Sequence, residues 1–154
     1  MATTLHTVRS NEAGDAGSPA PLPLLVRLAA EGAQPDQVAE AAVREWKQVH
    51  DALAPLIGQS GAAALYRRTL HLARADRPWL DPAFLGAVTP GDFSAYRDAL
   101  ARQDSAIAAG AHDETQRALR GLLINLIGPS LTERLLRAAA VSPSAGKAVQ
   151  DLPR

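Results

Sequence analysis

His71 is the residue best placed to do chemistry in this chain, because arginines surround it in the segment "ALYRRTLHLARADRPWL". The segment is expected to be helical, and on a helix Arg67, His71 and Arg74 lie on one face because they are four and three residues apart. Arg68 lies at the edge of that face. An exposed imidazole among guanidinium groups can bind a phosphate group or an acidic protein surface. The plainer interpretation is a solvated basic face on which the histidine has no role.

His71 and the residues after it resemble in part the motif of histidine-phosphotransfer domains, which are helical bundles with an exposed phosphoryl-accepting histidine. That motif is His-x-x-Lys-Gly, and here His71 is followed by Leu72, Ala73, Arg74 and Ala75. The basic residue at the third position agrees in kind. The glycine that lets a partner domain approach is absent. The resemblance implies a phosphoacceptor role for His71, and the missing glycine argues against it.

Trp79, in "DRPWLDP", is the other residue that could serve binding. It follows Pro78, which is expected to stop the preceding helix. Tucked over the end of the helices, the indole would be a plug of the core. Exposed together with Leu80 and Phe84, it would be an anchor for a partner protein. We favour the plug, because an isolated exposed tryptophan is unfavourable.

The remaining residue types do not form a catalytic or metal-binding pattern. The chain has no cysteine, and its four histidines lack the spacing of a metal site. Among these, His50 is expected at the border of an apolar stripe, His6 in a tail and His112 in a turn. The carboxylates are dispersed. We therefore expect no catalytic residue, no metal and no cofactor, and hence a protein that is not an enzyme.

Composition and charge favour a helical domain without affinity for nucleic acid or membrane. Hydrophobic residues make up 47 % of the 154 residues, aromatic residues only 4 %, and alanine and leucine dominate. Sixteen basic residues balance sixteen acidic ones. No apolar run reaches the roughly 20 residues that span a bilayer, and residues 1–20 lack the apolar centre of a signal peptide. These features predict a cytoplasmic protein.

Glycine and proline positions indicate one domain over residues 21–141, with a disordered tail over 1–20 and a flexible tail over 142–154. A short helix is expected over residues 21–32, followed by longer helices over 35–57, 61–77, 89–110, 113–127 and 130–141. The helix over 35–57 is expected to continue through Pro55. Thr89 and Asp92 have the spacing of a capping box that would open the third stretch.

Two copies of nearly the same letters occur in the chain, "LIGQS" ending at Ser60 and "LIGPS" ending at Ser130. Each copy is predicted to be a tight corner between two helices, in which Gly58 or Gly128 has a positive φ. Ser60 or Ser130 is predicted to cap the second helix of its corner. Either a duplication or convergence of two helical hairpins explains the repeat. Both lead to an all-α fold, a bundle of four principal helices from two αα-hairpins with one or two short helices.

The segments "ALYRRTLHLARADRPWL" and "LIGPSLTERLLRAA" resemble a group of small helical bacterial proteins without an established activity. The likeness covers roughly residues 35–140, implies a bacterial cytoplasmic protein and supplies no functional residues. From the sequence we expect a non-enzymatic interaction or regulatory module with a protein partner such as a signalling protein. The alternatives are a phosphotransfer or phosphate-sensing bundle that uses His71, and a small-ligand-binding bundle with a pocket between the hairpins. A narrow apolar stripe over residues 93–107 also predicts a homodimer.

Overall fold

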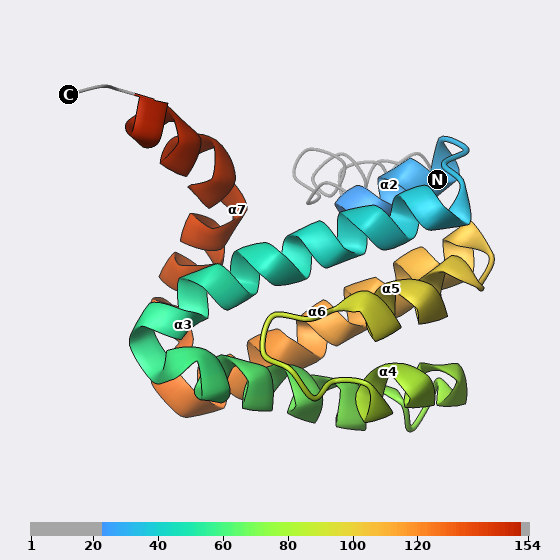
Figure 1. Cartoon of the computed structure of the whole chain (residues 1–154), viewed down its shortest axis with the longest axis horizontal. Coiled ribbons are helices and arrows are strands. Elements are labelled where there is room, and N and C mark those ends of the chain that lie inside the picture. The colour runs from blue at the N-terminus through green and yellow to red at the C-terminus, as the bar shows by residue number, and fades with distance from the viewer. Residues whose placement is uncertain (1–22, 152–154) are drawn as a thin grey trace, which may run out of the picture.

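The computed structural model of the chain describes the backbone of residues 23–151 and the side chains of residues 23–140, and all of its regular structure is helical (Figure 1). In chain order the elements are α2 (Leu24–Ala30), α3 (Pro35–Ala73), a 3-10 turn (Pro78–Leu80), α4 (Asp81–Leu85), α5 (Ser94–Ala101), α6 (Ser105–Ile127) and α7 (Pro129–Asp151). The predicted all-α class is therefore confirmed. In the described part of the chain, no helix is both long and apolar enough to cross a membrane.

Helix α3 is the longest element and contacts each of the other five α-helices. It begins at Pro35, and the amide of Gln34 donates to the side-chain oxygen of Gln37 at 2.8 Å, as in a capping box. It continues through Pro55, as the sequence predicts, because this residue lies on the exposed side of the helix. Figure 1 shows that α3 then turns back on itself, so that its two arms enclose parts of α5 and α6.

The turn within α3 and the junction of α6 with α7 have the same backbone geometry. Gly58 has φ 86° and ψ 163°, and Gly128 has φ 87° and ψ 161°. The positive φ at both residues agrees with the sequence prediction. The ψ values are extended rather than left-handed helical, and this combination is open essentially to glycine alone. Each corner is therefore made at a single residue.

The predicted serine caps at these corners are wrong. The Gly128 amide donates to the carbonyl of Ile124 at 2.9 Å, and the Gly128 carbonyl accepts from the amide of Thr132 at 3.1 Å. The glycine thus ends α6 and also begins α7, which places Ser130 inside the first turn rather than at the cap. The matching geometry at Gly58 places Ser60 in the first turn of the second arm of α3.

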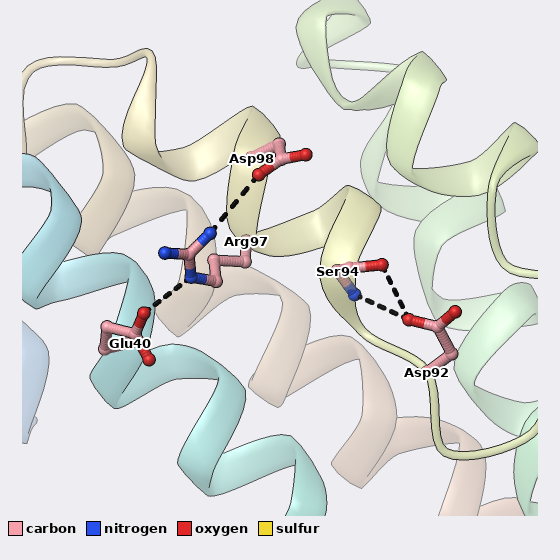
Figure 2. A network of polar contacts seen from close by, with 5 residues as sticks. All are labelled: Glu40, Asp92, Ser94, Arg97 and Asp98. Atoms are coloured by element: carbon pink, nitrogen blue, oxygen red, sulfur yellow. Dashed lines mark hydrogen bonds and ion pairs between the residues drawn. The ribbon is translucent and has the colours of Figure 1, made fainter.

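The predicted helix over residues 89–110 is also wrong, because two helices occupy this region and a break separates them. Residues 89–92 form a turn, in which the amide of Asp92 donates to the carbonyl of Thr89 at 3.1 Å. The Asp92 carboxylate caps α5 by accepting from the Ser94 amide at 3.0 Å and from its hydroxyl at 2.6 Å (Figure 2). After α5 the side chain of Asp104 accepts from the amide of Ala106 and starts α6, which then passes through Gly110 without interruption.

The apolar stripe from which a homodimer was predicted is mostly internal. Phe93, Tyr96 and Leu100 are buried in the core, and only Ile107 is exposed. The stripe therefore needs no second copy to cover it.

The repeat extends well beyond the corner letters. The displacement along the chain that carries Gly58 onto Gly128, here called the repeat shift, also carries the first residue of α2 onto that of α5 and the first residue of α3 onto that of α6. Burial follows the same register: Leu56 and Leu126 are each 58 % exposed, and the four residues Val49, Leu53, Leu119 and Leu123 are all buried. The chain therefore contains two structurally matching units, each with a short helix, a long helix, a glycine corner and a further helix.

The short helix of each unit packs mainly on the long helix of the other unit. Helix α2 lies chiefly against α6, whereas α5 lies chiefly against α3. An exposed ion pair joins α5 to α3, with Nε of Arg97 at 2.6 Å from Glu40 (Figure 2). The repeat shift relates Arg97 to Arg27 and Glu40 to Gly110, so the second unit has no carboxylate to match Glu40.

At the ends of the chain, the predicted tail over residues 1–20 lies outside the described residues. The backbone of α7 continues past residue 141, where we expected the domain to end, and reaches Asp151. Residues 152–154 also lie outside the described part.

Candidate functional site

The basic face around His71 is brought together by the structure, but two of its arginines hold α4 against α3. Arg67 donates to the carbonyls of Phe84 and Ala87 at 3.3 and 3.1 Å. Its guanidinium lies 4.5 Å from the centre of the Phe84 ring, and that of Arg74 lies 4.1 Å from it. Arg74 also pairs with Asp81 at 2.7 Å. These contacts give Arg67 and Arg74 a structural role.

His71 and Arg68 are the two residues of this face that remain exposed or half-exposed without holding α4. The His71 ring centre lies 5.6 Å from that of Phe84, and its Nδ1 lies 3.4 Å from a guanidinium nitrogen of Arg74. The imidazole is thus accessible from solvent, but the guanidinium groups of Arg67 and Arg74 beside it already have partners.

Trp79 lies in the 3-10 turn before α4, and it is partly buried against the core. Its side chain lines a hollow together with α5 residues such as Ala95 and Ala99. This placement is separate from the basic face, so the structure does not unite the predicted binding residues into one site.

A different cavity, of about 280 Å³, opens between α2, α3, α6 and α7. Its apolar wall includes Leu25, Val49 and Leu136. Polar groups of α3 and α6 also line it. They are Glu45, Gln48, His112, Asp113, Gln116 and Arg120. A cavity of this kind, with an apolar wall and a few convergent polar groups, is the usual form of a small-molecule site.

His112 is the central polar residue of this cavity, and it lies within α6 rather than in the predicted turn. It is only 2 % exposed, and both nitrogens of its ring have partners. Nε2 lies 2.9 Å from Oε1 of Glu45, and Nδ1 lies 2.6 Å from the hydroxyl of Tyr96. With Glu45 ionised, Nε2 donates to the carboxylate, so the imidazole fixes the orientation of the Glu45 side chain.

The chain of hydrogen bonds continues into the core. The Tyr96 hydroxyl also lies 3.1 Å from the hydroxyl of Thr115, which in turn donates to the backbone carbonyl of His112 at 2.7 Å. Burial raises the pKa of Tyr96 far above its usual range, so the phenol stays neutral. Glu45 is the outer end of this chain, and its side chain keeps 31 % of its surface exposed.

Gln116 adds an unsatisfied donor to the cavity. Its Nε2 is buried and has no hydrogen-bond partner among the described residues. A buried amide nitrogen without a partner is unfavourable by about 1–3 kcal/mol, and a bound acceptor would relieve that penalty. Nearby charges at the rim are paired instead, Arg120 with Glu133 and Asp113 with Arg117.

Comparison with known proteins adds no family to this geometry. No family model, no curated protein and no solved structure matches the chain. Among the described residues, no group of three or more acidic or histidine side chains is arranged to hold a metal ion.

Sequence reasoning missed this cavity because it placed the start of α6 too late. With the helix starting at residue 113, His112 fell in a turn and could not be aligned with Thr115 and Gln116. The signal that would have placed His112 in the helix is Asp104, an N-cap residue type that is followed by a helical stretch without proline.

Proposed function

We propose that the protein is a small-ligand-binding helical domain and that its site is the cavity between α2, α3, α6 and α7. The observation that carries this proposal is the unpartnered Nε2 of Gln116, which lines the same cavity as the oriented carboxylate of Glu45. The two-hairpin arrangement of four principal helices, predicted from the sequence, is part of this proposal as the frame that holds the cavity.

The site is suited to binding rather than to chemical reaction. A general base or nucleophile needs a free atom within reach of the substrate. Both nitrogens of His112 already have partners, and Tyr96 is fully buried and neutral. Glu45 then acts as a fixed hydrogen-bond acceptor, which is a recognition role.

Ligand-dependent thermal stability is the experiment that tests the proposal. A ligand present at roughly 100 times its Kd stabilises the folded state by about 2.7 kcal/mol, which raises Tm measurably. A set of small polar and aromatic compounds should contain members that raise the Tm of the wild type. Glu45→Gln should weaken this effect because it removes the charge, whereas Glu31→Gln, an exposed residue outside the cavity, should not. Compounds that raise the Tm of the wild type and of both variants equally would contradict the proposal.

An interaction or regulatory module is the second candidate, and exposed apolar residues beside the basic face favour it. Leu85 and Val88 are 63 % and 76 % exposed, and they directly follow Phe84 and Ala87, the two residues whose carbonyls accept from Arg67. On the basic face itself, Arg67, Arg68, His71 and Phe84 line one shallow hollow that is both aromatic and basic, which suits an acidic protein such as a signalling partner. A cytoplasmic setting, expected from the sequence, is part of the proposal for either candidate.

Phosphotransfer through His71 is a separate alternative to the interaction module, and one experiment distinguishes the two. Incubation with labelled acetyl phosphate or a phosphorylated receiver domain should leave no acid-labile label on the wild type, because Arg67 and Arg74 are already held by α4. Label on the wild type that is lost in His71→Gln would establish phosphotransfer. Binding of an acidic partner that weakens in Arg68→Glu, with no label, would support the interaction module.

A further inference from the structure

The residues that line the cavity and the residues of the aromatic core occupy matching positions in the two units. The repeat shift relates Gln116 to Trp46, Leu136 to Tyr66 and Pro23 to Phe93. Each first member lines the cavity, and each second member belongs to the aromatic cluster. The same shift relates Arg120, at the cavity, to His50, whose ring packs on Phe93.

The aromatic cluster is a solid packing of rings. The ring centres of Trp46 and Tyr66 lie 4.7 Å apart and those of Tyr66 and Phe93 lie 4.8 Å apart, both edge to face. Trp46 and Phe93 stack at 6.2 Å. Trp46, Tyr66 and Phe93 are all at most 5 % exposed, so the rings themselves fill the space between α3 and the start of α5.

The cavity is the corresponding space with those rings removed. Its walls include residues of α6, of the start of α2 and of α7, which are the counterparts of the elements around the aromatic cluster. Glutamine, leucine and proline stand where the first unit has tryptophan, tyrosine and phenylalanine. The helices of both units thus enclose a space at the same position. Aromatic rings fill this space in the first unit, and the smaller side chains of the second unit leave it open.

We infer that the cavity binds a small planar aromatic molecule of two fused rings that carries a ring N–H, of the indole type. This inference rests on the proposed ligand-binding function and names its ligand class. A cavity of about 150 Å³ accommodates benzene, so the roughly 280 Å³ available here fits a fused bicyclic ring. The counterpart position holds such a ring already, in the indole of Trp46.

The polar groups of the cavity match the substituents of such a ligand. The Glu45 carboxylate, held by His112, accepts a hydrogen bond from a ring N–H. Gln116 Nε2 can donate to a ring acceptor or to the π face of the ligand. Leu25, Val49 and Leu136 cover the apolar faces of the ring.

Three probes test the inference by titration of the full chain, followed by the NMR shifts of the Gln116 side-chain amide. They are indole, 1-methylindole, which keeps the shape and lacks the donor, and n-octanol, which is apolar but flexible. We expect indole to shift the Gln116 resonance and to bind about tenfold more tightly than 1-methylindole. Glu45→Gln should bring the two affinities together, because the charged acceptor is gone.

Filling the cavity with the residue of the matching unit is the second arm of the test. Gln116→Trp and, independently, Leu136→Tyr should each weaken indole binding at least about tenfold while the helical circular dichroism stays unchanged. Asn125→Trp, also on α6, exposed and outside the cavity lining, should leave binding intact. Two variants are used so that one that fails to fold does not leave the inference without a test.

The outcomes separate this inference from the proposed function. Binding of octanol in preference to indole, lost in Gln116→Trp, would overturn the aromatic class and leave the ligand-binding function standing. Indole and 1-methylindole that bind equally to the wild type would overturn the N–H recognition. The absence of binding by all three probes would overturn the aromatic class, while compounds that raise Tm in a Glu45-dependent way would still support the ligand-binding function.

Discussion

Around Trp46 the space between α3 and α5 is filled with aromatic rings, whereas around Gln116 the matching space between α6 and α2 is a cavity of about 280 Å³. The helix starts, the corners and the burial register of the two regions are alike. The difference lies in a few side chains, and it shows how a repeated backbone can provide stability at one place and a binding site at the other.

The two regions also differ in how firmly their short helices are attached. Helix α5 has the Asp92 cap at its start and the Arg97–Glu40 ion pair to α3 (Figure 2). Helix α2 begins after Pro23 without a side-chain cap, and Gly110 stands where a carboxylate would be needed for Arg27. The filled region therefore has additional polar contacts as well as more buried aromatic area.

The largest expected effect comes from truncating the two matching residues at the centre of each region. Trp46→Ala should lower the free energy of unfolding by about 3–5 kcal/mol, because it removes a fully packed indole and leaves a void. Gln116→Ala should not lower it, because the variant also removes the unfavourable unpartnered amide, which offsets the packing lost at the border of a void. Urea unfolding followed by circular dichroism measures both. Equal costs would show that the two regions are packed alike.

The corner glycines should give intermediate and closely equal effects. Gly58→Ala and Gly128→Ala should each be unfavourable by about 1–3 kcal/mol, because a Cβ is strained at these φ and ψ values even though it would meet no atom within 4 Å. Gly121→Ala, within α6 and equally free of contacts, should instead stabilise by about 0.5–1 kcal/mol. Thermal unfolding of the three variants checks this. Clearly different losses of stability in Gly58→Ala and Gly128→Ala would show that the two corners are not equivalent, despite their matching backbone angles.

The Asp92 cap should contribute stability that depends on pH. Its pKa is lowered chiefly by the hydrogen bond from the Ser94 hydroxyl and also by the Ser94 amide. A carboxylate with a lowered pKa stabilises the folded state above its unfolded pKa of about 3.9, and this contribution disappears as the pH falls through the folded value. Wild type should therefore be slightly more stable than Asp92→Asn at pH 7, and the two should converge below about pH 4.

Tm measured from pH 7 down to pH 3 tests this, with Asp51→Asn on the exposed side of α3 as the matched control. A gap between wild type and Asp92→Asn that widens as the pH falls would have the wrong sign. The repeat shift relates Asp92 to Leu22, which has no carboxylate. This pH-dependent contribution is therefore expected in only one of the two units.

The all-α class and the glycine corners were predictable, because both depend on local patterns. Apolar residues at spacings of three and four specify the long helices, and a glycine between two such runs predicts a positive φ. The register of the repeat was visible in the same letters. The extent of the match was not, because α2 and α5 share few residue types and only their place in the fold relates them.

The cavity was not predictable, because it depends on which side chains are absent from a packed space. Gln116 is an ordinary helical residue in the sequence, and only the structure brings it to one cavity with Leu136 and Glu45. The grouping of the basic residues on one helix face follows from their spacing alone. Their contacts do not, because the bonds of Arg67 and Arg74 with the α4 region join residues that a loop separates in the sequence.

The smallest expected effect concerns the two serines of the repeated letters. A serine at an N-cap contributes about 1 kcal/mol, which Ser→Ala would remove. Here the Gly128 carbonyl already begins α7, and the Gly58 corner has the same backbone angles. Ser60→Ala and Ser130→Ala should therefore each change the free energy of unfolding by less than about 0.5 kcal/mol.

Thr132→Val is the contrasting variant, because the Thr132 hydroxyl donates to the Gly128 carbonyl at 2.7 Å and the residue is buried. Its loss should exceed that of either serine variant when all three are measured by urea unfolding. If Ser130→Ala lowered the free energy of unfolding by about 1 kcal/mol, roughly the contribution of a serine cap, Ser130 would be the residue that caps α7. Near-zero values at both serines would leave glycine as the residue that makes each corner, and would show that the two units share a backbone conformation rather than a side-chain hydrogen bond.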